Sequence, residues 1–224
     1  MTAMASLAER LDAVREGVAD AAREANRDVA DVTTIVVTKF HPASMVRELH
    51  DLGVRDFGES RHQEAQPKIA ELHELEASWH FIGQLQSKKA RQVATYIDVI
   101  HSVDRDSLAV ALAGNSLDVF IQVNLTDDPG RGGVDPDGIH HLAEQLLAAE
   151  GVELRGLMAV APLGREPRQA FATVRELSER LRSVAPRADA LSIGMSGDYR
   201  EAILEGATHL RIGTAITGNR PAPG

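Results

Sequence analysis

Lys39 stands at the end of an apolar run, where a lysine can act as a nucleophile. Residues 34–38 read Thr-Ile-Val-Val-Thr, which is typical of a strand buried on both faces of a sheet. Burial against apolar surface favours the neutral amine of a lysine, and a neutral amine can attack an aldehyde to form a Schiff base. Position alone favours the simpler interpretation, a lysine that marks the strand end and extends into water. Other residues must decide between the two.

A second group of residues, near the C-terminus, has the composition of a phosphate site. Ser196 and Thr214 offer hydroxyl groups, while Gly197 and Gly213 allow backbone N–H groups to approach an anion closely. Each segment alone is as typical of a helix start or a tight turn. As the ends of two neighbouring strands they predict an anion site. The two segments are Gly-Met-Ser-Gly at 194–197 and Arg-Ile-Gly-Thr at 211–214.

The lysine and the anion site together predict a ligand that carries both an aldehyde and a phosphate. Pyridoxal 5'-phosphate is such a ligand, and Lys39 would supply its amine. Arg211 precedes Gly213 by two residues, so on a strand both point to the same side. A guanidinium beside the pyridine nitrogen would keep that nitrogen unprotonated. Arg211 could instead clamp the phosphate or pair with Glu59.

The elements between these residues must bring the two ends of the chain together. Eight short apolar segments are each followed by a helical pattern, and an amphipathic helix at 5–26 precedes them. The fold class is therefore α/β, a single (β/α)₈ TIM barrel with an extra N-terminal helix, in which all C-terminal strand ends meet on one face. An open doubly wound sheet is the main alternative, but no GxGxxG turn follows the first strand. The strands are expected at 34–39, 54–57, 79–82, 98–103, 117–124, 154–160, 190–193 and 209–212.

Composition excludes several other classes of protein. The 224 residues are 43% hydrophobic and 25% charged without a flexible linker, which predicts one domain over 1–224. Absence of cysteine excludes disulfides and thiolate metal sites, and no histidine spacing such as HxxEH suggests a metal. With 24 Lys and Arg against 33 Asp and Glu, binding to nucleic acid or anionic membrane is not expected. The N-terminus lacks a leader pattern, so we expect a cytoplasmic protein, and we expect a monomer.

Seven ordered motifs together resemble the pyridoxal phosphate homeostasis protein family, which has the fold of the alanine racemase N-terminal domain. The resemblance implies an internal aldimine on Lys39, phosphate contacts from Ser196, Gly213 and Thr214, and Arg211 near the pyridine nitrogen. It also implies a protein that binds the cofactor and supplies it to pyridoxal phosphate-dependent apo-enzymes, without established turnover. The motifs are Val37-Thr-Lys39, Phe57-Gly-Glu59, Trp79-His-Phe-Ile-Gly83, Leu85-Gln-Ser87, Gly156-Leu-Met158, Leu191-Ser-Ile-Gly-Met-Ser196 and Arg211-Ile-Gly-Thr214.

Some residues depart from the family pattern or carry secondary expectations. Ser60-Arg61 stands where the family usually has Asn-Tyr, Lys88 where it has Asn, and Arg131 where it tends to carry a lysine. Met158 is expected to form the floor of the pocket, and His80 to lie hydrogen-bonded beneath the cofactor.

Two enzymatic functions are alternatives to that of a cofactor carrier. An amino acid racemase needs a second acid or base opposite Lys39, usually a tyrosine from a further β domain, for which no residues follow Gly224. The tyrosines of this chain, Tyr96 and Tyr199, are not obvious substitutes. An aldolase-type phosphosugar enzyme would need a carboxylate near Lys39, for which Glu59 is the candidate. The sequence favours the carrier, with the racemase as the alternative.

Overall fold

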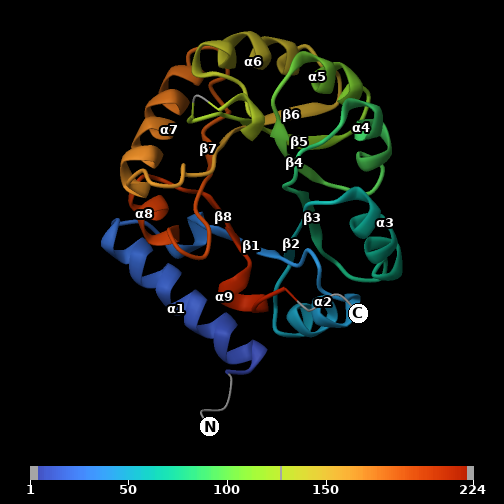
Figure 1. The fold of residues 1–224 in the computed structure, drawn as a ribbon, viewed down its shortest axis with the longest axis vertical. Coiled ribbons are helices and arrows are strands. Elements are labelled where there is room, and N and C mark those ends of the chain that lie inside the picture. Colours follow the sequence, from blue (N-terminus) through green and yellow to red (C-terminus); the bar gives the residue numbers. More distant parts are fainter. Residues whose placement is uncertain (1–4, 127, 221–224) are drawn as a thin grey trace.

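Eight parallel strands close into a barrel in the order β1 to β8, as Figure 1 shows. The structure is a computed structural model that describes residues 5–126 and 128–220. The predicted (β/α)₈ barrel is confirmed. The strands are β1 (Thr33–Val37), β2 (Asp56–Glu59), β3 (Ser78–Phe81), β4 (Val99–Val103), β5 (Leu117–Gln122), β6 (Val152–Met158), β7 (Ala190–Ser192) and β8 (His209–Ile212).

Helices surround the barrel on the outside (Figure 1). They are α1 (Leu7–Glu24), α2 (Ala43–Asp51), α3 (His62–Glu71), α4 (Ser87–Val93), α5 (Asp106–Leu112), α6 (Ile139–Leu147), α7 (Pro167–Leu181), α8 (Tyr199–Leu204) and α9 (Thr214–Thr217). Three 3₁₀ turns, η1 (Val29–Asp31), η2 (Pro129–Arg131) and η3 (Pro136–Gly138), lie in the connections. None of the helices within residues 5–126 and 128–220 has the length and apolar character needed to cross a membrane.

The expected N-terminal helix is present as α1. Ser6 begins it with a capping box, in which its hydroxyl accepts from the Glu9 N–H and the Glu9 carboxylate accepts from the Ser6 N–H. The buried stripe of α1, which includes Leu11 and Val18, packs against α8 and α9, as seen at the lower left of Figure 1. The helix therefore supports the last two strand-to-helix connections, where the predicted anion site lies.

The first and last strands are neighbours, which brings the two ends of the chain together. Val36 of β1 pairs with Ile212 of β8 on one side and with Phe57 of β2 on the other. Residues 35–37 are buried as the apolar run predicts. This closure puts the turn after β1 beside the segment that follows β8.

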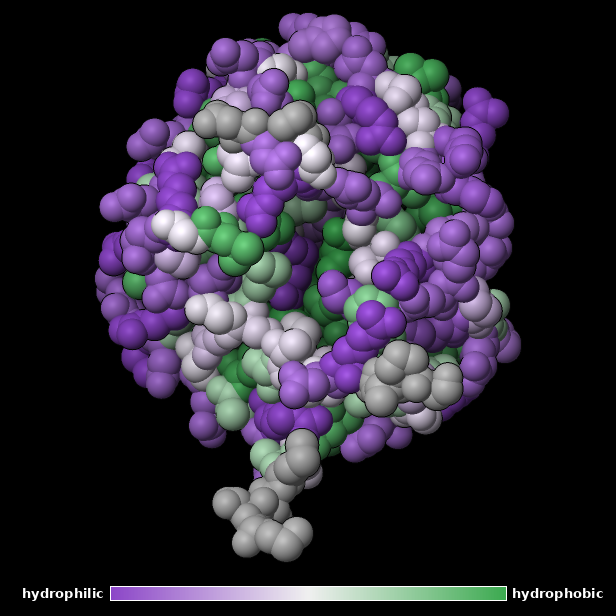
Figure 2. All heavy atoms as spheres, in the orientation of Figure 1, coloured by the Kyte–Doolittle hydropathy of each residue, from purple (hydrophilic) through white to green (hydrophobic). Residues whose placement is uncertain are grey.

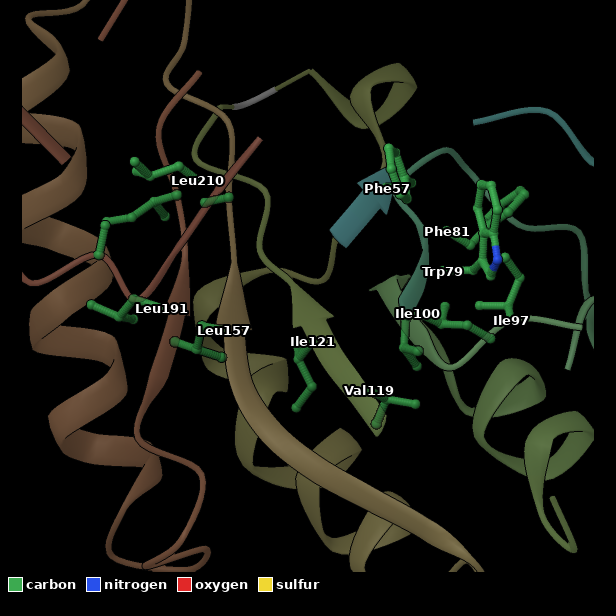
Figure 3. Close-up of a cluster of buried hydrophobic side chains, with 14 of the residues drawn as sticks. Phe57, Trp79, Phe81, Ile97, Ile100, Val119, Ile121, Leu157, Leu191 and Leu210 are labelled. Carbon is green, nitrogen blue, oxygen red and sulfur yellow. The ribbon is translucent and has the colours of Figure 1, made fainter. Parts of the chain in front are cut away.

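Most of the apolar core lies between the barrel and its helices. Figure 3 shows part of it, in which Phe57 and Trp79 from β2 and β3 pack with ring centroids 5.4 Å apart. Alternation along β5 sends Val119 and Ile121 into this core, while Phe120 joins a separate small cluster with Met158 and Ala190. Burying each such large side chain stabilises the fold by about 1.5–3 kcal/mol.

Some element boundaries differ from those predicted. β1 ends at Val37, so Lys39 lies in a turn two residues beyond the strand. The turn closes through the His41 N–H and the Thr38 carbonyl at 3.0 Å, and Phe40 takes a positive φ of 68° there. β2 begins two residues later than expected, and α3 ends at Glu71 instead of reaching residue 75, although it continues through Pro67.

Gly156→Ala is expected to destabilise the protein by about 3 kcal/mol, from overpacking and backbone strain together. Gly156 lies in β6 at φ 154°, and a Cβ there would overlap the carbonyl of Ala190 in β7. The free energy of unfolding from urea titration measures the effect. The matched control is Gly114→Ala, because Gly114 also has a positive φ, 83°, but has open space around its Cβ position. Equal losses in the two variants would contradict the overlap argument.

Candidate functional site

All seven residues predicted to bind the ligand line a single cavity of about 470 Å³. It lies at the C-terminal ends of the strands, and a hollow is visible at the centre of the molecule in Figure 2. The sequence thus identified residues that the fold brings together, although they are up to 175 positions apart, from Lys39 to Thr214. The full lining is Val37, Lys39, Ile82, Met158, Val160, Met195, Ser196, Gly197, Arg211, Gly213 and Thr214.

Lys39 is half-buried at one side of the cavity. Its Nζ lies 5.9 Å from the centroid of the Phe40 ring. Two further cations approach the same ring, Arg61 at 5.0 Å and Arg220 at 4.2 Å. Arg61, one of the departures from the family pattern, therefore contributes positive charge beside the lysine.

A buried ion pair holds the backbone immediately before Lys39. Lys68 Nζ lies 2.6 Å from Glu59 Oε1 and donates a second hydrogen bond to the Thr38 carbonyl at 2.9 Å. The Thr38 hydroxyl donates to the same Glu59 oxygen at 2.8 Å. Glu59 is thus paired with Lys68 and not with Arg211, which was an alternative at the sequence level. No sequence pattern predicted a role for Lys68, because its role depends on how α3 packs against the end of β1.

Ser196 organises the predicted anion site. Its Oγ accepts hydrogen bonds from the backbone N–H groups of Gly213 and Ala215, each at 3.3 Å. Both bonds are long, and the Ser196 hydroxyl hydrogen is left to donate. Two amides and one hydroxyl therefore converge where the loop after β7 meets the start of α9, beside the exposed Gly197 and Thr214.

Arg211 is held rigidly on β8 with 4% of its surface exposed. One Nη atom donates to the Ser192 carbonyl at 2.6 Å and to the Ser192 hydroxyl at 2.7 Å, and the other donates to the Ala159 carbonyl at 3.0 Å. Burial lowers the pKa of Arg211 to about 10, so the guanidinium is charged at neutral pH. A fixed cation therefore faces the cavity.

The remaining walls of the cavity are apolar. Met158, at the end of β6, is almost fully buried and packs against Phe120. The sequence did not single out Val37, Ile82, Val160 or Met195, which complete the lining. Val37, Ile82 and Met195 belong to motifs quoted above, whereas Val160 was expected at the end of a strand and lies in the loop after β6.

His80, expected to lie hydrogen-bonded beneath the cofactor, is not among the residues that line the cavity. It lies deeper in the barrel and contacts His101 and Asp56. Complete burial, assisted by the neighbouring His80, Arg211 and His209, lowers the pKa of His101 well below its ordinary value. Within the described residues, no three His, Cys, Asp or Glu side chains are arranged to hold a metal ion.

The protein is expected to lose stability as the pH falls from 6.5 towards 4. Burial lowers the pKa of His209 to about 4, and His101 shifts in the same direction. Both histidines have a lower pKa in the folded protein than in the unfolded chain. Their contribution to the free energy of unfolding is therefore fully present above pH 6.5 and is lost at lower pH, as protons bind the unfolded chain. Between pH 6.5 and 4, His209→Asn should reduce the slope of the free energy of unfolding against pH by about 1.4 kcal/mol per pH unit. The exposed His73→Asn is the control, and equal slopes in both variants would contradict the assignment.

The fold and the cavity define a barrel of the alanine racemase N-terminal domain type, and residues 10–221 match that domain family. The chain is 41% identical to the pyridoxal phosphate homeostasis protein of Pseudomonas aeruginosa, over 97% of each chain. It is 38% identical to that of Escherichia coli K12, over 97% of this chain and 98% of the other. The structure of PipY from Synechococcus elongatus PCC7942 with pyridoxal phosphate bound superposes with a TM-score of 0.83, at 39% identity over 95% of this chain and 100% of PipY. The chain belongs to the pyridoxal phosphate homeostasis protein family.

Proposed function

We propose that the protein binds pyridoxal 5'-phosphate in this cavity and holds it as a Schiff base on Lys39. The observation that carries the proposal is the convergence of an amine, a buried guanidinium and a hydroxyl-and-amide cluster on one cavity. The aldehyde of the cofactor would condense with the Lys39 amine and release water. PipY, a relative of 39% identity, has been solved with this cofactor bound.

The residues present fit each part of the cofactor. A cavity of about 470 Å³ lies in the range of small-ligand sites, about 300–1,000 Å³. Ser196 and the amides of Gly213 and Ala215 suit a phosphate, since the hydroxyl and the N–H groups can all donate. Arg211 would face the pyridine nitrogen and, as a charged donor, keep it unprotonated. Met158 and the other apolar side chains would contact the ring.

The proposed role is intracellular homeostasis and supply of the cofactor, not amino acid racemisation. We propose that residues 1–224 form one cofactor-binding domain, which acts as a monomer in the cytoplasm and passes the cofactor to apo-enzymes. A racemase needs a second proton carrier at the site. The Tyr96 hydroxyl is hydrogen-bonded to His62 Nδ1 at 2.8 Å, and the Tyr199 hydroxyl packs against Gly17 of α1. Neither tyrosine lines the cavity, which favours a holding role.

The proposal is tested by adding pyridoxal 5'-phosphate to the purified protein and recording its absorbance. A band near the violet edge of the visible range should appear, and borohydride should fix the cofactor on the peptide that contains Lys39. Mass spectrometry of the digest locates the adduct. An adduct on Lys68, Lys88 or Lys89, or no adduct at all, would overturn the assignment.

The carrier role is tested separately from binding. Protein loaded with the cofactor is incubated with D- and L-amino acids, and the products are separated by a chiral assay. Negligible interconversion is expected, because no second proton carrier faces Lys39 in the described part of the cavity lining. Substantial turnover would replace the carrier role with the racemase alternative.

A further inference from the structure

A continuous chain of buried hydrogen bonds runs through the interior of the barrel to Arg211. His80 Nε2 lies 3.1 Å from Asp56 Oδ1, and His80 Nδ1 lies 2.9 Å from His101 Nε2. His101 Nδ1 lies 2.8 Å from the Ser192 hydroxyl, which is 2.7 Å from an Nη atom of Arg211. All its members except Asp56 are nearly or fully buried, namely His80, His101, Ser192 and Arg211. Two of them, His80 and His101, have no part in the proposed chemistry.

The hydrogen-bond chain ends at Asp56 and at Arg211, which lie at opposite ends of the barrel. Asp56 is the first residue of β2, on the N-terminal side, and 30% of its side chain is exposed. Arg211 faces the cavity near the C-terminal side. The ring of His101 is held between them by stacking on Phe120, with centroids 4.6 Å apart and planes 12° from parallel. This chain of hydrogen bonds therefore connects the solvent-facing N-terminal side of the barrel to the cavity.

The chemistry of the two ends sets the direction of every hydrogen bond between them. A guanidinium can only donate and a carboxylate can only accept. The Ser192 oxygen accepts from Arg211, so its own hydrogen is free to be donated to His101 Nδ1. His101 then carries its proton on Nε2 and donates to His80 Nδ1, and His80 carries its proton on Nε2 and donates to Asp56.

Hydrogen bonds that ran in the opposite direction would leave the buried Ser192 hydroxyl without an acceptor. If His101 carried its proton on Nδ1, the Ser192 oxygen would accept from both His101 and Arg211. Its hydroxyl hydrogen would then lack an acceptor, since Ser192 Oγ has these two side-chain partners alone among the described residues. An unsatisfied buried hydroxyl is costly. Full burial also opposes a charged His101.

We propose that Asp56, His80, His101 and Ser192 form a one-directional hydrogen-bond chain that positions Arg211 from the far end of the barrel. Both imidazoles are neutral and carry their proton on Nε2. The four are positioning residues, because they act on the cavity through Arg211. Their importance for the cofactor rests on the proposed function, but the directions of the hydrogen bonds are properties of the protein without any ligand.

The directions are tested by NMR of protein labelled with ¹⁵N-histidine, with no cofactor added. Long-range ¹H–¹⁵N correlation spectra distinguish the two neutral tautomers and the imidazolium form. At neutral pH, His80 and His101 should both show the neutral Nε2–H pattern. An Nδ1–H pattern or an imidazolium at either residue would overturn the proposal, and failure of cofactor binding would not affect the result.

Coupling along the chain is tested with Asp56→Leu and Asp56→Asn. Leucine removes the terminal acceptor, so both His80 and His101 should lose their pure Nε2–H patterns, although His101 does not touch residue 56. Asparagine offers a carbonyl oxygen in the same place and should restore both patterns. A change confined to His80 would overturn the proposed coupling. If Asp56→Leu fails to fold, the wild-type tautomers still decide the direction.

The Arg211 end of the chain is tested with Ser192→Ala. The variant removes one of three hydrogen bonds from the guanidinium. The Arg211 Nη resonances should exchange slowly in the parent protein, and Ser192→Ala should abolish both them and the pure His101 pattern. The control is Asp106→Leu, which removes the acceptor of an exposed pair with His141 at 2.9 Å. It should leave both inner histidines and Arg211 unchanged. Retention of both signals in Ser192→Ala would overturn the role of Ser192.

Discussion

Replacing Lys39 by alanine is expected to abolish the borohydride-stable adduct with pyridoxal 5'-phosphate. The chain has four lysines, Lys39, Lys68, Lys88 and Lys89, all within its described part, and only Lys39 lines the cavity. Lys68 is occupied by Glu59 and the Thr38 carbonyl, and Lys88 is exposed on α4. Without Lys39, the described lining contains no amine that could form the Schiff base, so the absorbance band should be lost completely.

Lys39→Arg separates the loss of the amine from the loss of charge. Arginine keeps a cation beside Phe40 but does not form the Schiff base, so the adduct should be absent while reversible binding of the phosphate remains. The control is Lys88→Ala, because that side chain is exposed and away from the cavity lining, and it should leave the adduct intact. A retained band in Lys39→Ala would refute the assignment.

Sequence patterns, together with the family resemblance, were enough to predict the barrel and seven of the eleven residues that line its cavity. Apolar runs such as 35–37 specify buried strands, and the glycine-containing segments after β7 and β8 specify tight connections. Once eight parallel strands close, their C-terminal ends must lie on one face. The meeting of Lys39 with Arg211 then follows from topology, without knowledge of any single contact.

The contacts that support these residues could not be predicted in the same way. The pairing of Lys68 with Glu59 depends on the angle at which α3 returns to the end of β1. The link between His101 and Ser192 joins residues 91 positions apart across the barrel interior. Such contacts depend on the register and tilt of the strands, which a pattern of apolar residues does not specify. Sequence therefore revealed the polar residues and Met158 that face the cavity, and the structure reveals which contacts hold them.

The buried pair of Lys68 and Glu59 should have the largest effect on stability. Glu59 is fully buried and the Lys68 side chain is 9% exposed. Lys68→Met leaves the carboxylate with the Thr38 hydroxyl as its side-chain partner within the described structure, since Glu59 Oε2 already lacks a hydrogen-bond partner there. Loss of one partner of a buried pair costs about 3–5 kcal/mol. Urea titration of the variant and the parent protein measures this difference.

A double variant distinguishes the unpaired charge from lost packing. Lys68→Met combined with Glu59→Gln removes both charges and should recover most of the lost free energy, because the remaining amide is far cheaper to bury than a carboxylate. The control is Arg23→Met, which breaks an exposed pair with Asp20 at 2.8 Å and should cost less than about 1 kcal/mol. If the single and double variants are equally unstable, the effect comes from packing around α3. Because Lys68 also holds the Thr38 carbonyl, the single variant should in addition weaken formation of the Lys39 adduct.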